Sequence, residues 1–368
     1  MTRTFSLKGK TYSPSNILII AELGTGHRGN TARAKELVDA AALAGADCIK
    51  VQIVYADEIL HPATGTVPLP GGNIKLYDVF KTLEAPINFY AELKDYAESK
   101  GLLFLASPFG RRSAQELFCL SPDFVKVASP ELNYTELLQT IAAWHIPALL
   151  SSGVSTLADI ENALHYFDRT AICLLHCVTA YPAPESDYNL TVLRHLSGIF
   201  GVSVGISDHS LDPVIVPTLA VANGACLIEK HFCLSRGDSG LDDPIALPPK
   251  DFLMMSNAIR RAQKRDSISI IEDAKITFGV EKVNAVLGDG VKKLSGAEEN
   301  NYLRTNRSIH ALIEIKEGDM FTRDTIAVLR TEKVLRPGLP PSFFEMLLGR
   351  AARRIIPAGQ GVLWDDVL

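Results

Sequence analysis

Charged and hydroxyl side chains end or follow a series of short apolar runs in the first three quarters of the chain. Lys50 and Gln52 are two residues apart, as are Glu229 and His231, so in a β-strand each pair lies on one face. The other groups of this kind are Glu22, Lys126, Ser129, Glu131, Ser151, His176, Thr179, Tyr181, Ser207 and His209. Because each unpaired buried charge costs several kcal/mol, so many groups converging at one edge indicate a functional site.

The residue types in this set suit a particular chemistry. Two lysines beside several serines would bind a phosphorylated, carboxylated anion. His209 and His231 form an incomplete ligand set for a divalent metal, with positions open to water or substrate oxygens. Glu22 and Glu131 are placed to act as acid or base, or to bind hydroxyls. An anion site beside a metal predicts addition of a phosphorylated nucleophile to a polarised carbonyl.

Eight apolar runs predict the strands that position these groups. They occupy residues 16–23, 47–53, 102–107, 124–128, 148–152, 171–177, 203–207 and 226–232. Residues 31–44 and 87–100 have helical spacing and end at Gly45 and Gly101. Nearly continuous apolar strands are typical of a parallel sheet covered on both faces. Eight of them with crossovers predict an α/β fold, a (β/α)₈ TIM barrel whose active site lies where these strands end. A doubly wound open sheet is the alternative, although no G-x-G-x-x-G motif follows the first run.

The rest of the chain has a different pattern. Residues 1–285 form the predicted barrel domain, residues 286–306 are polar without periodicity and predict a linker, and residues 307–368 predict short strands and turns. Within the last segment, the stretch from Ile315 to Ile326 resembles the stretch from Ile356 to Val367. Each places a glycine at a tight turn with apolar residues beyond it. The repeat predicts a small, pseudo-symmetric, mostly-β domain.

Composition excludes several function classes. The chain has 368 residues, of which 47% are hydrophobic and 21% charged, with a formal net charge of −5, as in globular proteins. A slightly acidic chain is not expected to bind nucleic acid. No apolar run approaches the ~20 residues that span a bilayer, so we expect no membrane association. Six cysteines without a C-x-x-C pair indicate reduced thiols and a cytoplasmic location.

At these residues the sequence resembles the sialic acid synthase family. The matching stretches are Ile20-Ala-Glu22-Leu-Gly24, Ile49-Lys50-Val-Gln52, Lys126-Val-Ala-Ser129-Pro-Glu131, Leu150-Ser-Ser-Gly153, Leu175-His-Cys177, Gly205-Ile-Ser-Asp-His209 and Glu229-Lys-His-Phe232. The C-terminal part is similar to the antifreeze-like (SAF) domain that ends these synthases, including Leu348-Gly-Arg-Ala-Ala352. The resemblance covers nearly the whole chain, and the combination of motifs is specific.

The resemblance implies condensation of phosphoenolpyruvate with N-acetylmannosamine, or with a related di-N-acetylated sugar, to give a nonulosonic acid and phosphate. It implies that Glu22, His209 and His231 are catalytic and that the two histidines bind Mn²⁺ or Mg²⁺. The residues implied to bind phosphoenolpyruvate are Lys50, Lys126, Ser129, Ser151, Thr179 and Ser207. Those implied to contact the sugar are Gln52, Glu131, Tyr181 and Asp242.

The resemblance also implies a domain-swapped homodimer, in which the SAF domain of one chain caps the barrel of the other and supplies an arginine to the sugar. Arg330 and Arg336 both fit this role, and Arg330 fits slightly better because it ends a predicted strand. Residues 55–80, rich in Pro and Gly, predict a loop over the barrel mouth. Thr179 departs from the Asn common in the family, and the acceptor stays open among N-acetylmannosamine and legionaminic, pseudaminic or spore-coat sugar precursors.

Two other functions compete with this one. A Schiff-base pyruvate aldolase would use Lys50 or Lys126 as the nucleophile, which requires a lysine of depressed pKa. A non-catalytic sugar-binding relative would keep the barrel without turnover.

Overall fold

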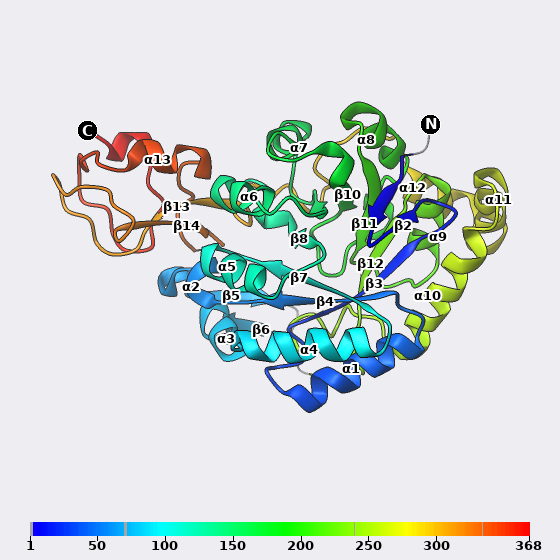
Figure 1. The fold of residues 1–368 in the computed structure, drawn as a ribbon. Helices are drawn as coiled ribbons and strands as arrows, with labels where there is room; N and C mark the ends of the chain where they lie inside the picture. Colours follow the sequence, from blue (N-terminus) through cyan, green and yellow to red (C-terminus); the bar gives the residue numbers. More distant parts are fainter. Residues whose placement is uncertain (1–2, 70–71, 239, 333) are drawn as a thin grey trace.

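Strands and helices alternate along most of the chain, and the strands form one parallel sheet. The computed structural model describes residues 3–69, 72–238, 240–332 and 334–368. Its strands are β3 (Leu18–Gly24), β4 (Cys48–Ile53), β7 (Leu103–Pro108), β8 (Val125–Val127), β9 (Ala148–Ser151), β10 (Ile172–Cys177), β11 (Ser203–Asp208) and β12 (Leu227–His231). They follow one another in the order β7-β4-β3-β12-β11-β10-β9-β8. All neighbours in this order are parallel, and β7 lies against β8. The sheet is therefore a nearly closed barrel, which confirms the predicted fold (Figure 1).

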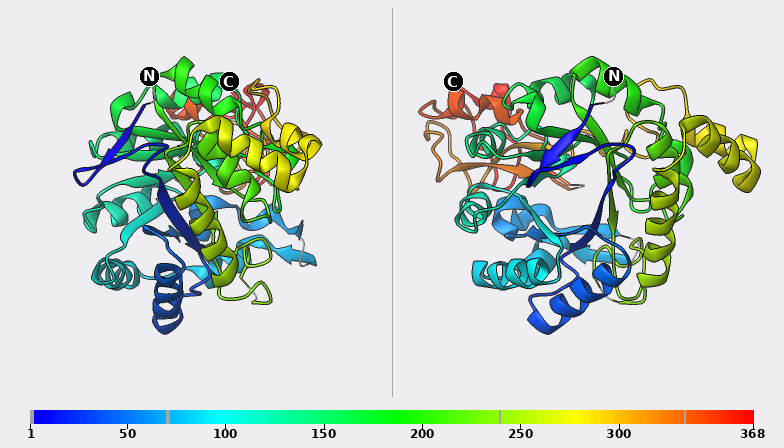
Figure 2. Two further views of the ribbon diagram at one scale, coloured as in Figure 1. Left: turned by 90° about the vertical axis from the view of Figure 1, so that its right-hand side faces the viewer. Right: turned by 45° about the vertical axis from the view of Figure 1, so that its right-hand side comes forward.

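Alternation along each strand divides the barrel interior into an apolar end and a polar end. Leu18, Ile20, Cys48, Leu105 and Leu149 lie in one buried apolar cluster near the amino ends of the strands. The N-terminal hairpin of β1 (Phe5–Leu7) and β2 (Lys10–Tyr12) packs into the same cluster and covers that end (Figure 2). The next inward residues along β3, β4 and β12 are polar. The hairpin thus closes the apolar end of the barrel, and the polar end is the one that can hold a functional site.

Helices outside the barrel cover the sheet. They are α1 (Thr31–Leu43), α4 (Ile87–Ser99), α5 (Arg111–Cys119), α6 (Thr135–Ala142), α7 (Leu157–Leu164), α8 (Val192–Phe200), α9 (Ile215–Ala222), α10 (Pro249–Ala262), α11 (Ser267–Phe278) and α12 (Val280–Leu287). Short 3₁₀ turns occupy Pro62–Thr64, Ser129–Glu131, Arg169–Ala171, Glu185–Asp187, Pro341–Phe343 and Trp364–Asp366. Helix α1 begins where the Asn30 side chain accepts a hydrogen bond from the Arg33 amide. Gly45 and Gly101 follow α1 and α4 with positive φ, as the sequence predicts for helix ends.

The segment predicted as a loop over the barrel mouth has secondary structure of its own. It contains α2 (Ala56–Ile59), the hairpin of β5 (Thr66–Leu69) and β6 (Gly72–Lys75), and α3 (Leu76–Leu83). Ile59, Leu76 and Phe109 belong to a separate apolar cluster beneath it. Residues 70 and 71 of the predicted loop lie outside the described residues.

The C-terminal domain is built from two copies of one motif. Its elements are β13 (Arg307–Ala311), β14 (Ile326–Arg330) and α13 (Phe344–Leu347), and it lies beside α2 and α6 (Figure 1). Ile315 and Ile356 exchange both backbone hydrogen bonds. Around this pair, the bond from the Gly318 amide to Ala352 is matched by the bond from Gly359 to Ala311. Gly318 and Gly359 both have positive φ. The two stretches that repeat in the sequence are therefore related by a pseudo-twofold axis.

In the described part of the chain, helices are too short or too polar to cross a membrane.

Candidate active site

The carboxyl ends of the barrel strands open into a cavity of about 640 Å³. Most of the side chains singled out from the sequence line it. They are Glu22, Lys50, Gln52, Lys126, Ser129, Ser151, Thr179, Tyr181, Ser207, His209, His231, Asp242 and Arg330. They come from seven of the eight barrel strands or the loops that follow, and from β14. The parallel register brings them together, because the polar positions all fall near the same end of each strand.

Two lysines and two glutamates form the floor of this cavity. Lys50 Nζ lies 2.6 Å from Glu22 Oε2 and 3.9 Å from Glu229 Oε1. Lys126 Nζ lies 3.8 Å from the same Glu229 oxygen. Gln52 Nε2 donates to Glu22 Oε1 at 2.8 Å, which fixes the second carboxylate oxygen. The four charges are buried, and each is matched by an opposite one.

The local charges set the protonation of this floor. Burial lowers the pKa of Lys50, but Glu22 and Glu229 outweigh burial and leave that pKa raised. Burial dominates at Lys126 and lowers its pKa. At Glu229 burial raises the pKa, yet Lys126 and Lys50 outweigh it and bring the pKa to about 2. Glu229 is therefore an anion at neutral pH, and Lys50 is a cation.

Several buried polar atoms around the floor lack a hydrogen-bond partner within the described structure. They are Oγ of Ser107, Oγ of Ser151, Oγ1 of Thr179 and Oε2 of Glu229. Gly153 packs so closely between Thr179 and Ser129 that a Cβ there would lie 2.0 Å from Thr179 Oγ1. Buried polar atoms are normally satisfied, so unpaired hydroxyls beside two lysines indicate a place for an oxygen-rich ligand.

The two histidines face each other across the mouth. Their ring centroids are 5.4 Å apart, and Tyr181 stacks on His209 at 4.3 Å. His209 Nδ1 lies 2.9 Å from the Val178 carbonyl. A proton on Nδ1 that donates to this carbonyl leaves the Nε2 lone pair free, as metal ligation requires. His231 Nδ1 lies 3.8 Å from Asp242 Oδ2, which adds a carboxylate at the same edge.

These residues fit a divalent metal with an incomplete protein shell. In the described residues, no group of three or more His, Cys, Asp or Glu is arranged to hold a metal by itself. Two imidazoles with Asp242 nearby leave several positions for oxygen ligands, which suits Mn²⁺ or Mg²⁺ when a substrate completes the shell. A metal at His209 and His231 stays a prediction, and it would require substrate or water oxygens in addition.

Three residues named in the sequence analysis lie away from the cavity. Glu131 is fully buried beside it, where its Oε1 pairs with Arg307 at 2.9 Å and Arg330 at 2.8 Å. Arg336 bonds to the Gly361 carbonyl and to Asp366 at the far side of the C-terminal domain. His176 points out of the barrel, where its Nε2 contacts the Tyr188 carbonyl at 2.6 Å. In β10 the inward residues are Leu175 and Cys177, so including His176 among the residues of the polar edge was wrong by one position.

Sequence reasoning gave no role to Glu229 and Cys177, which both line the cavity. Glu229 lies between both lysines, and its place two residues before His231 gave it the same inward orientation. Cys177 also lines the cavity, with its Sγ 3.8 Å from His209 Nδ1. Its spacing from Leu175 would have identified it, had the strand register been known. Periodicity alone therefore indicates Glu229, whereas Cys177 also requires the register of β10.

The outer end of the cavity differs in character. Ile59, Ile74, Leu76 and Phe80 from the mouth segment form an apolar wall there, together with Phe109. The Arg330 guanidinium lies over the Phe109 ring at 5.4 Å and reaches the cavity from the C-terminal domain of the same chain. A ligand would thus have a charged inner end and a partly apolar outer end.

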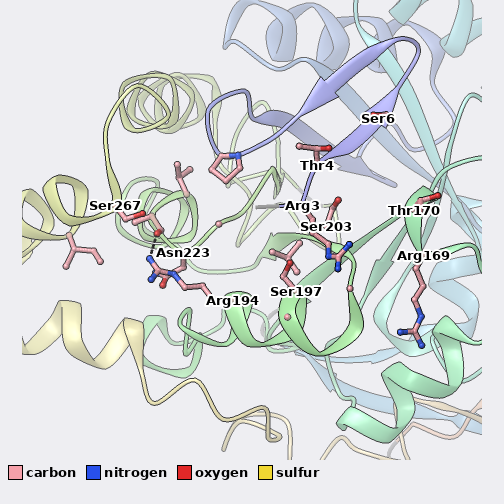
Figure 3. A pocket seen from close by; sticks show the side chains of 18 of the residues that line it. Arg3, Thr4, Ser6, Arg169, Thr170, Arg194, Ser197, Ser203, Asn223 and Ser267 are labelled. Atoms are coloured by element: carbon pink, nitrogen blue, oxygen red, sulfur yellow. Dashed lines mark hydrogen bonds between the residues drawn. The ribbon is translucent and has the colours of Figure 1, made fainter. Parts of the chain in front are cut away.

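A larger cleft of about 1380 Å³ lies elsewhere, beside the N-terminal hairpin and helices α8, α9 and α11 (Figure 3). Its lining includes Arg3, Arg169 and Arg194. Arg169 donates to the carbonyl of Phe200, the last residue of α8, and Arg194 donates to Ala222, the last residue of α9. Guanidinium groups at helix C-termini are explained by the helix dipole and its free carbonyls. This cleft therefore needs no ligand to account for its charge.

Barrel and site together define a class of (β/α)₈ enzyme with lysines at the cavity floor, histidines at the mouth and an appended small C-terminal domain. The NeuB family model matches residues 37–268, and the SAF domain model matches residues 306–368. The chain belongs to the NeuB family. The sequence-based identification of a synthase-like, phosphoenolpyruvate-dependent enzyme of the sialic acid synthase family is thereby confirmed at family level.

Individual relatives agree with this assignment. The spore coat polysaccharide biosynthesis protein SpsE of Bacillus subtilis is 34% identical over 99% of this chain and 97% of its own length. The N,N'-diacetyllegionaminic acid synthase of Campylobacter jejuni is 31% identical, over 92% of this chain and 96% of its own. The crystal structure of SpsE matches with a TM-score of 0.81 over 99% of both chains. The N-acetylneuraminic acid synthetase of Leptospira borgpetersenii matches with a TM-score of 0.64 and 28% identity, over 82% of this chain and 95% of its own.

Proposed function

We propose that the protein condenses phosphoenolpyruvate with an N-acetylated or di-N-acetylated hexose, giving a nonulosonic acid and inorganic phosphate. The observation that carries this proposal is the cavity floor, where Lys50 and Lys126 lie beside the unpaired hydroxyls of Ser151 and Thr179. Lysine ammonium and hydroxyl donors suit the phosphate and carboxylate of phosphoenolpyruvate. The acceptor sugar would then lie between the bound phosphoenolpyruvate and the mouth of the cavity.

The charge of the cavity supports a role for a divalent metal. The charges of Lys50 and Lys126 are already matched by Glu22 and Glu229, Arg330 pairs with Glu131, and Asp242 adds a further carboxylate to the lining. A multiply charged anion is repelled by such a surface unless a cation enters with it. His209 and His231 would hold the metal, which would polarise the aldehyde oxygen of the open-chain sugar.

The residues of the chain would then orient the reactants. Carbon 3 of phosphoenolpyruvate attacks the aldehyde carbon, and the aldehyde oxygen takes up a proton. Water adds to the cationic carbon 2, and phosphate leaves as the bond between carbon 2 and its bridging oxygen breaks. Glu22 would position the water or accept its proton, because Lys50 and Gln52 hold its two oxygens in place. Ser129 and Ser207 would complete the anion site.

The outer end supports an acceptor with acyl or deoxy groups. Gln52, Tyr181, Asp242 and Arg330 provide polar contacts there, while Ile74 and Phe80 provide apolar surface. An N-acetyl group has both an amide to hydrogen-bond and a methyl to bury. This mixed surface suits N-acetylmannosamine and the di-N-acetylated hexoses alike.

Phosphate release from phosphoenolpyruvate with Mn²⁺ tests the proposal across a panel of N-acetylated and di-N-acetylated hexoses. Release with one sugar that chelator abolishes would support the synthase and name its acceptor. A folded, metal-loaded protein that releases phosphate with none of them would contradict it and favour a non-catalytic sugar-binding role.

One observation favours the pyruvate aldolase as a second candidate. Burial lowers the pKa of Lys126, and a lysine of lowered pKa is what a Schiff-base mechanism needs. Borohydride with pyruvate would trap a covalent adduct on Lys126 in an aldolase. The synthase leaves all its lysines unmodified in the same experiment.

The assembly and location expected from the sequence stay predictions. In this structure Arg330 lines the cavity of its own chain. The domain-swapped homodimer predicts that the same arginine reaches the partner's cavity instead. Sedimentation of the purified protein would give the oligomeric state, and fractionation of cells would test the cytoplasmic location.

A further inference from the structure

The segment that connects barrel and SAF domain carries a buried carboxylate. Glu298 lies in residues 286–306, which the sequence predicts to be a linker, yet only 1% of its surface is exposed. Its Oε1 accepts hydrogen bonds from two backbone amides, Val154 at 2.7 Å and Thr179 at 2.9 Å. Its Oε2 accepts one from the Ser295 amide at 3.2 Å. One carboxylate therefore joins the loop after β9 to the loop after β10.

Both loops carry groups of the cavity floor. The loop after β9 contains Gly153, whose amide donates to Ser129 Oγ at 3.0 Å. The loop after β10 contains Thr179, whose unpaired hydroxyl lies against Gly153. The position of these groups relative to each other depends on the two backbone amides that Glu298 holds.

The loop after β9 also has a strained backbone that needs support from its surroundings. Val154 has a φ of 42°, in the left-handed region that a β-branched residue avoids. Residues of the connecting segment bind both sides of it, Glu298 at the Val154 amide and Asn306 Nδ2 at the Val154 carbonyl, 3.0 Å away. Lys292 Nζ holds the neighbouring Ser152 carbonyl at 3.0 Å. The strained turn persists because the connecting segment fixes it from outside the barrel.

We propose that Glu298 is a positioning residue for the phosphoenolpyruvate site. It holds the backbone at Val154 and Thr179 so that Gly153, Ser129 and the Thr179 hydroxyl face the anion. The inference rests on the proposed function, since it assigns these loops to phosphoenolpyruvate. It makes the connecting segment part of the substrate site rather than a passive link.

Three variants test this role. Glu298→Ala removes the acceptor, and we expect the Kd for phosphoenolpyruvate to rise about 10-fold to 100-fold, as for loss of hydrogen bonds to a charged group. Glu298→Gln keeps a carbonyl oxygen that accepts the same two amides, so we expect a rise of only a few-fold. Glu299→Ala changes an exposed neighbour and serves as the matched control, with no change expected.

Calorimetric titration with phosphoenolpyruvate and Mn²⁺, without sugar, gives the binding constant, and steady-state kinetics give the KM of each substrate. The KM for phosphoenolpyruvate should rise while the KM for the sugar stays within about two-fold. A Glu298→Ala protein that binds phosphoenolpyruvate like the wild type, or that raises both KM values equally, would overturn the proposal.

The experiment separates this inference from the proposed function. A wild-type protein that neither binds phosphoenolpyruvate nor releases phosphate would contradict the function itself. If Glu298→Ala does not fold, Glu298→Asp keeps the buried charge but is too short to reach both loops. We expect Glu298→Asp to raise the Kd for phosphoenolpyruvate about 10-fold, and unchanged binding would overturn the inference.

Discussion

Glu131 of the barrel and Arg307 of the SAF domain form an ion pair of 2.9 Å in which neither side chain is exposed. Arg307 also donates to three carbonyls of the barrel and the mouth segment, those of Phe109 at 2.7 Å, Glu58 at 2.5 Å and Ile59 at 3.4 Å. The pair therefore connects three parts of the chain that are far apart in sequence. Arg330, which lines the cavity, binds the same Glu131 oxygen, so the joint also positions a site residue.

Glu131→Gln should destabilise the protein by about 3–5 kcal/mol, because it leaves two buried guanidinium groups without a counter-ion. Urea unfolding at neutral pH measures the loss. Glu345→Gln is the matched control, since Glu345 pairs with Arg323 at the surface and is 70% exposed, and it should cost under about 1 kcal/mol. Equal losses for the two variants would show that the buried pair is not a structural joint.

Arg330 and Arg336, the two arginines that the sequence could not separate, should give different defects. Arg330→Ala removes a lining cation while Arg307 still neutralises Glu131, so we expect a folded protein with a sugar KM raised about 10-fold or more. Arg336 bonds to Gly361 and Asp366, so Arg336→Ala should lower stability and leave both KM values unchanged. A sugar KM that rises only in Arg336→Ala would reverse the assignment.

The sequence predicts features that depend on neighbouring residues of the chain, and it misses features that depend on residues far apart in the chain. The inward orientation of Lys50, Gln52 and His231 depends only on a period of two along a strand, which is local. His176 was misplaced because strand register depends on the neighbouring strands, and a shift by one residue reverses every side chain. The pairing of Glu131 with Arg307 joins two domains, and no local pattern contains it.

The same distinction separates Glu298 from the rest of the site. Its surroundings are polar and aperiodic, so composition predicts a solvated linker. Glu298 is buried because its carboxylate accepts hydrogen bonds from the Val154 and Thr179 amides, two loops far away in sequence that meet it only in three dimensions. The repeat of the C-terminal domain lies at the opposite extreme, since similar turns around Gly318 and Gly359 already indicated the pseudo-twofold axis.

A buried histidine of the SAF domain should make stability depend on pH. Burial lowers the pKa of His310 from 6.5 to about 4, while its Nδ1 lies 2.8 Å from the Gly359 carbonyl. The nearby His61, Arg307 and Arg336 contribute to this lowered pKa, and the hydrogen bond to the Gly359 carbonyl opposes it in part. Between these pH values the unfolded chain binds a proton that the folded chain does not, so stability rises with pH and is lost as pH falls from 6.5 toward 4.

Urea unfolding from pH 7 to pH 5 measures this dependence. His310 should contribute on the order of 1.4 kcal/mol per pH unit in that window. His310→Gln should flatten the curve by that amount, although it also lowers stability at pH 7. An unchanged slope would mean that His310 takes up a proton in the folded protein.

The metal assignment predicts that His231→Ala abolishes turnover and leaves the fold intact. His231 ends β12 at the polar side of the barrel and faces His209 across the cavity, so alanine there leaves the apolar end of the barrel and the backbone pairing of β12 in place. Chelator should abolish wild-type activity, and added Mn²⁺ should restore it. Because the described chain offers only these two imidazoles, with Asp242 near His231, loss of one should also abolish Mn²⁺ binding measured by equilibrium dialysis. His165→Ala, an exposed site on the surface, should keep both activity and metal. A fully active His231→Ala protein would remove the basis for a metal at the barrel mouth.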